Sequence, residues 1–97
     1  MNSVTDERPL LVFFHQPTCG RCRRTEGFIA QVLQRRSNHR TFRLRHVDVE
    51  QRPDLGEKFR VSTLPTLVVV DEGSVKARLT KPHGCTDIQD LLKPWLK

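Results

Sequence analysis

The sequence predicts an α/β fold in which a four-stranded mixed sheet is flanked by helices, in the order β-α-β-α-β-β-α. Two apolar runs, residues 10–14 and 66–70, are typical of strands buried on both faces. Apolar residues recur at helical spacing in other stretches. A length of 97 residues suits a single domain over residues 1–97, with residues 1–9 expected to be irregular.

The first half of the chain is expected to form a strand, a long helix and a second strand. The strand at residues 10–14 ends at polar residues, and an amphipathic helix begins near Cys19. Polar residues 37–40 end this helix, and residues 41–49 form the second strand, whose irregular apolar alternation leaves its register open. The apolar face of the helix consists of Phe28, Ile29, Val32 and Leu33.

The second half begins with a short helix and a hairpin. Pro53 opens the helix, with Asp54 in its first turn. Turn residues 71–74 then join the buried strand at 66–70 to an antiparallel strand at 75–79.

The last helix carries clear local signals. Thr86 and Gln89 are expected to form a capping box, in which the two side chains satisfy backbone N–H groups of the first turn. Pro94 is expected to disturb the final turn. The apolar face consists of Ile88, Leu91, Leu92 and Trp95.

Positive charge is concentrated in one part of the chain, and the net charge is +6. Such a face attracts acidic partners or nucleic acid, or is simply solvated. Because the strands lack the aromatic-and-basic signature of RNA-binding sheets, a nucleic-acid partner is not expected. The charge is concentrated in residues 21–45, where Glu26 is the single carboxylate and the arginines are Arg21, Arg23, Arg24, Arg35, Arg36, Arg40, Arg43 and Arg45.

Neither a secretory signal nor a membrane-spanning segment is expected. The first nine residues contain no apolar run, and runs such as residues 67–70 are far too short to cross a bilayer. A cytoplasmic location without a membrane partner is therefore expected.

Cys19-Gly20-Arg21-Cys22 lies where a buried strand ends and a helix begins. Unpaired N–H groups and the helix dipole lower the pKa of a cysteine there, so Cys19 is expected to be the attacking thiolate. Cys22, one helical turn later, is expected to resolve a mixed disulfide with a substrate. Arg21 favours the thiolate further, which makes the couple more oxidising.

A Cys-x-x-Cys motif also forms half of many zinc sites. Completing one here requires His83 and Cys85, or His15, from distant segments, and the spacing matches none of the usual knuckle pairs. No metal is therefore expected, and no cofactor other than the cysteine pair.

From about residue 10 to residue 97 the chain resembles the thioredoxin family. The resemblance rests on the strand, the Cys-Gly-Arg-Cys motif and its helix, on Val-Asp-Val-Glu at 47–50, and on Val-Ser-Thr-Leu-Pro-Thr at 61–66. It implies that the Leu64–Pro65 bond is cis and lies opposite the disulfide. It also implies that the backbone at Thr63 and Leu64 pairs with a substrate chain, and that the proline keeps metals off the thiols.

The chain departs from the family pattern at positions around the motif. Because phenylalanine cannot transfer a proton, the resolving step is expected to be slower, or to use water, His15 or Glu26. The departures are Thr18 for Trp, Arg21 for Pro, Phe13 for a buried Asp that assists the resolving thiol, and His46 near the position of a buried Lys.

The short series of strands and helices also resembles that of glutaredoxins, in which a loop similar to residues 84–87 holds glutathione. Thr86 and Asp87 are candidates for that contact, although capping of the last helix alone explains both residues. Cys85 is a candidate third redox thiol, a glutathionylation site or a packed residue. His15 lies four residues before Cys19, and its side chain is a candidate for an orienting role, a packing role or proton transfer.

These observations favour an enzyme that exchanges disulfides with protein substrates and is regenerated by thioredoxin reductase or glutathione. The alternatives are a glutathione-dependent, glutaredoxin-like reductase and a non-catalytic adaptor whose cysteine pair switches the binding of a partner. Turnover separates an enzyme from an adaptor, and the electron donor separates the two enzymes.

Overall fold

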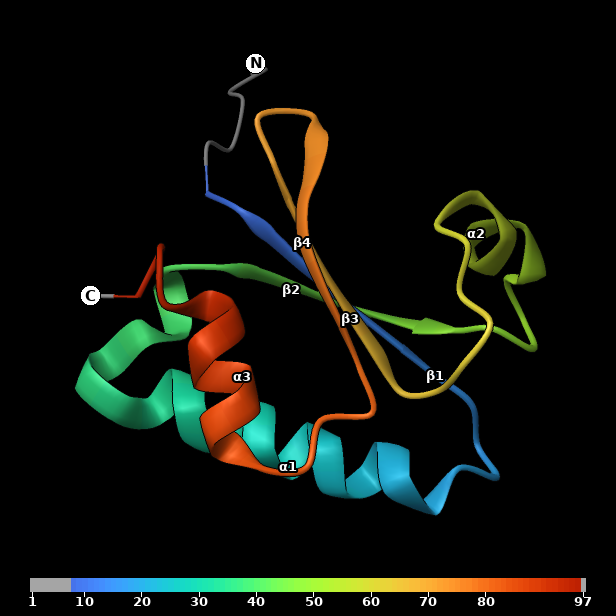
Figure 1. Ribbon diagram of the computed structural model, residues 1–97, viewed down its shortest axis with the longest axis horizontal. Helices are drawn as coiled ribbons and strands as arrows, with labels where there is room; N and C mark the ends of the chain where they lie inside the picture. Colours follow the sequence, from blue (N-terminus) through green and yellow to red (C-terminus); the bar gives the residue numbers. More distant parts are fainter. Residues whose placement is uncertain (1–7, 97) are drawn as a thin grey trace.

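The computed structural model describes residues 8–96, so residues 1–7 of the expected irregular segment lie outside the described part. The observed order confirms the predicted β-α-β-α-β-β-α arrangement (Figure 1). None of the helices within residues 8–96 has the length and apolar character that crossing a membrane requires. The elements are β1 (Leu10–His15), α1 (Gly20–Gln34), the 3₁₀ helix η1 (Arg35–Arg40), β2 (Arg43–Asp48), α2 (Pro53–Lys58), β3 (Thr66–Asp71), β4 (Ser74–Thr80) and α3 (Cys85–Leu92).

The sheet has the strand order β2-β1-β3-β4. β1 is parallel to β2, which requires a crossover that α1 supplies, whereas β3 is antiparallel to both β1 and β4. Figure 1 shows α1 and α3 together on one side of the sheet and α2 on the other. The predicted mixed sheet with helices on both faces is therefore confirmed.

The core lies on both faces of β1, because successive side chains of a strand point to opposite sides. Leu11 and Phe13 pack in a cluster with α1 and α3. Val12 and Phe14 pack in a second cluster that includes Leu55 of α2. Because β1 is packed on both faces, its end is held in place against α1. The cysteine motif, which joins the two elements, is therefore held in place as well.

The segment between α1 and β2 explains the irregular alternation in the sequence. Residues 35–40 continue as a 3₁₀ helix, and β2 starts only at Arg43. β2 is an edge strand, so its apolar residues are unevenly covered: Val47 is buried, whereas Leu44 is 41% exposed.

The predicted capping box of α3 is wrong. The helix begins one residue before Thr86, and its N-cap is a glycine without a side-chain acceptor. Gln89 instead accepts a hydrogen bond from the side chain of Arg35 at 2.6 Å. Asp87 now occupies the third helical position, and its carboxylate accepts the backbone N–H of His83 at 2.8 Å.

Candidate functional site

Cys19 and Cys22 form a disulfide, with their Cα atoms 5.2 Å apart. Cys19 is the N-cap of α1, and its Sγ accepts a hydrogen bond from the backbone N–H of Cys22 at 3.1 Å. Cys19 is half-buried, whereas Cys22 is only 4% exposed. A molecule from solvent therefore reaches the sulfur of Cys19 more readily than that of Cys22.

The turn into α1 is held by local hydrogen bonds. The backbone N–H of Cys19 donates to the carbonyl of Gln16 at 3.1 Å, and the buried Thr25 hydroxyl donates to the carbonyl of Arg21 at 3.0 Å. Gly20 is exposed, and the first turn contains no acidic residue. The local charge is therefore positive, from the exposed side chains of Arg21, Arg23 and Arg24.

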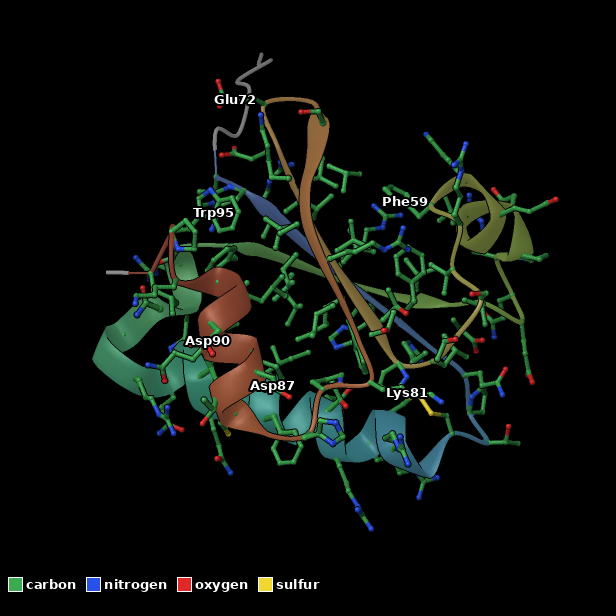
Figure 2. All side chains as sticks on the ribbon, in the orientation of Figure 1. Phe59, Glu72, Lys81, Asp87, Asp90 and Trp95 are labelled. Atoms are coloured by element: carbon green, nitrogen blue, oxygen red, sulfur yellow. A yellow bond between two sulfur atoms is a disulfide. The ribbon has the colours of Figure 1, made fainter. Side chains whose placement is uncertain are left out.

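The Leu64–Pro65 peptide bond is cis, as the resemblance implied. Because Thr66 pairs with the penultimate residue of β1, the proline lies beside the end of β1 that leads into the cysteine turn. The N–H of Lys81 donates to the Pro65 carbonyl at 2.9 Å, and the Thr66 hydroxyl donates to the Thr63 carbonyl at 2.6 Å. Figure 2 shows the disulfide at this same end of the sheet.

A pocket of about 200 Å³ adjoins the disulfide. Its wall includes Phe13 and His15 of β1, the N-cap residue Cys19, and Cys22 and Glu26 of α1. The ring of Phe13 is buried and stacks on the ring of His15, with a centroid distance of 5.3 Å. The site thus places a carboxylate and an imidazole beside the cysteine pair.

His46 of β2 pairs with Glu26, a contact that the sequence did not reveal. Its Nε2 lies 3.4 Å from a carboxylate oxygen of Glu26, and its ring lies 5.5 Å from that of Phe13 and 6.0 Å from that of His15. The signal that could have indicated it is the parallel register, in which His46 lies opposite Phe13. Helical periodicity then places Glu26 one turn after Cys22 on the same side of α1.

The remaining candidates lie at the start of α3. Cys85 is a free, half-buried cysteine, and its sulfur lies 3.1 Å from the side-chain oxygen of Gln31, to which it donates. Thr86 is exposed, and Asp87 is engaged locally by the N–H of His83. Within residues 8–96, no group of three or more His, Cys, Asp or Glu residues could hold a metal ion.

A cysteine pair at the N-terminus of a helix that follows a central strand, with a cis-proline just before the neighbouring antiparallel strand, defines the thioredoxin-fold class. The sequence model of the thioredoxin family matches residues 1–94. The chain therefore belongs to the thioredoxin family, and the predicted family and fold are confirmed.

Relatives and solved structures agree with this assignment. Mitochondrial thioredoxin of Mus musculus is 31% identical over 98 residues, covering 97% of this chain and 53% of the relative. That of Bos taurus is 30% identical over 94 residues, with the same coverage. The chain thus spans about half the length of these curated relatives.

Among solved structures, the thioredoxin Deadhead of Drosophila melanogaster superimposes with a TM-score of 0.81 at 18% identity, covering 94% of this chain and 84% of that one. Mitochondrial thioredoxin 3 of Saccharomyces cerevisiae gives a TM-score of 0.79 at 20% identity, with coverages of 91% and 79%. At sequence identities this low, the superpositions show that this chain and the two solved structures share a fold.

The expected cytoplasmic location is wrong. The relatives from mouse, rat and cattle are mitochondrial thioredoxins, and so is the yeast protein of similar structure. The expectation rested on the lack of an apolar segment near residue 1. Mitochondrial transit segments are amphipathic and rich in arginine rather than continuously apolar, so that criterion does not detect them.

Proposed function

We propose that the protein is a thiol–disulfide oxidoreductase that acts on disulfides of other proteins, with Cys19 as the attacking thiol and Cys22 as the resolving thiol. The observation that carries this proposal is the unequal burial of a bonded cysteine pair at a helix N-terminus. The accessible sulfur meets the client, and the buried one is held within bonding distance of it.

The reaction proceeds in two displacements. The Cys19 thiolate attacks one sulfur of a client disulfide, and the other client sulfur leaves as a thiolate. Cys22 then attacks Cys19 in the mixed disulfide, and the second client sulfur leaves. The client gains two electrons and the cysteine pair loses them, so no cofactor takes part. The N–H of Cys22 and the helix N-terminus stabilise the first thiolate, and Arg21 adds a positive charge.

The client segment binds beside the cis-proline loop. We propose that the backbone at Thr63 and Leu64 pairs with it as an added strand, next to Pro65. In support, Leu64 and Gln16 line a groove of about 370 Å³ that continues to Val49 and α2. An extended peptide in this groove would present its disulfide to Cys19.

We propose thioredoxin reductase as the electron donor, in mitochondria. A relative from Mycobacterium leprae, a bifunctional thioredoxin reductase/thioredoxin, is 24% identical over 84% of this chain and 17% of that protein. That single polypeptide joins the two activities, which supports the pairing. Glutathione is the competing donor. We favour it less because Asp87, in the loop at residues 84–87 that would hold glutathione, already accepts the N–H of His83.

The test is reduction of insulin disulfides, with thioredoxin reductase and glutathione compared as donors. We expect the wild type to turn over with the reductase and the variants Cys19→Ser and Cys22→Ser to lose turnover. Cys85→Ser is the matched control, because it removes the remaining thiol and should keep the activity. A folded wild type without turnover with either donor would contradict the proposal and favour a redox-switched adaptor.

A further inference from the structure

We propose that Glu26 accepts the proton of Cys22 in the resolving step and that His46 positions the Glu26 carboxylate. The inference rests on the oxidoreductase function proposed above. It assigns the proton transfer to residues on two elements, α1 and β2, which the fold brings together at the pocket beside the disulfide.

The resolving thiol needs a proton acceptor because only a thiolate attacks a disulfide at a useful rate. Cys22 is 4% exposed, so bulk water has little access to it. Phe13, which faces the same pocket from β1, has no group that accepts a proton. Of the described residues that line the pocket, Glu26 is the one carboxylate.

Helix geometry places the two groups together. Glu26 follows Cys22 by four positions in α1, so both side chains lie on one side of the helix. Both line the pocket that adjoins the disulfide, which has room for a bridging water molecule. A proton can therefore pass from the sulfur to the carboxylate through that water.

His46 holds the carboxylate at the pocket. Its Nε2 lies 3.4 Å from Glu26 Oε2, and its ring is fixed against Phe13. The other titratable or charged groups that face the pocket are His15 from β1 and Arg23 from α1. The Glu26 side chain is 65% exposed, so it can pass the proton on to solvent once it has accepted it.

The S–H bond of Cys22 breaks and its proton goes to the Glu26 carboxylate. The Cys22 thiolate attacks Cys19 Sγ, the Cys19–Cys22 bond forms, and the bond from Cys19 to the client sulfur breaks. The client sulfur leaves as a thiolate, and Glu26 returns its proton to solvent.

The experiment follows the two displacements separately by stopped flow. The reduced protein, in a Cys85→Ser background, is mixed with 4,4′-dithiodipyridine, a neutral disulfide that releases one thiopyridone when Cys19 attacks and a second when Cys22 resolves the adduct. Glu26→Gln removes the acceptor. Glu72→Gln is the matched control, because it makes the same charge change in the turn between β3 and β4, which Figure 2 shows at the opposite end of the sheet.

We expect Glu26→Gln to slow the second release about tenfold and to leave the first release within about twofold. This is less than the 10²–10⁴ of a fully enclosed base, because the side chain is exposed. His46→Gln should slow the second release less and alter its dependence on pH. Glu72→Gln should behave as the wild type.

An unchanged second release in Glu26→Gln throughout the pH range would overturn the inference, and so would equal slowing in Glu72→Gln. Failure of the oxidoreductase function gives a different result, since the wild type would then release both thiopyridones but would not turn over insulin disulfides with either donor.

Discussion

Cys19 and Cys22 share one helical turn but differ in surroundings. The sulfur of Cys19 accepts the N–H of Cys22 at the N-terminal end of the helix, and Arg21, which lies between the two cysteines in the sequence, has an exposed side chain. These groups interact with a negative sulfur more favourably than with a disulfide. They therefore stabilise the reduced form relative to the oxidised form.

Arg21 provides a test of that electrostatic argument. We expect Arg21→Pro to lower the reduction potential, because removing the cation destabilises the thiolate and hence the reduced form. Proline is tolerated in the first turn of a helix, so the fold should persist. Equilibration with reduced and oxidised glutathione measures the potential. Arg21→Ala removes the charge without adding a ring and should shift it in the same direction; an unchanged or higher potential in both variants would refute the argument.

Single residues show where sequence reasoning succeeds and where it stops. The motif at residues 19–22 was predicted because its signal is contiguous in sequence, whereas the cis bond before Pro65 was expected only from the resemblance to the thioredoxin family. The pairing of Glu26 with His46 was not, because it depends on the register between β1 and β2 and on the rotation of α1. The register of β2 was open for the same reason that Leu44 is exposed: an edge strand buries its side chains unevenly.

Among the elements, α3 shows how a local signal can be shifted by one position. The helix begins one residue before Thr86, which removes the predicted cap, and the start is held instead by the carboxylate of Asp87. The bond from the N–H of His83 satisfies one of the backbone donors at the helix entrance.

We expect Asp87→Ala to lower the free energy of unfolding by about 1 kcal/mol, since the N–H of His83 loses its acceptor. Urea unfolding of the oxidised protein measures the change. Thr86→Ala, one position away and exposed, should change stability by less than about 0.5 kcal/mol. A larger loss of stability in the Thr86 variant than in the Asp87 variant would contradict this account and support the capping box that the sequence predicted.

At the scale of the whole molecule, the net charge of +6 lies largely on the segment that begins at the cysteine motif. The exposed arginines of α1 border the site, and the carboxylate in that stretch, Glu26, is paired with His46. Long-range attraction should therefore raise the encounter rate with acidic clients.

Two cystine peptides of equal length, one with acidic and one with neutral flanking residues, test this expectation. Raising the ionic strength from about 0.01 M to 0.15 M shortens the Debye length from about 30 Å to about 8 Å. We expect the rate constant for the acidic peptide to fall severalfold and that for the neutral peptide to stay nearly constant. Parallel salt dependences for the two peptides would show that the charge is merely solvated.

The position of Trp95 has a consequence for spectroscopy. Its indole N–H donates to Asp71 at 3.2 Å, and its ring meets that of Phe42 edge-on at 6.4 Å. Both contacts lie at the end of the sheet away from Cys19, and Figure 2 shows Trp95 there. The sequence has one tryptophan and no tyrosine, so intrinsic emission comes from this indole. Fluorescence therefore reports unfolding of the C-terminal turn and is insensitive to whether the distant sulfur atoms are joined, so one optical signal can follow the melting of both redox forms.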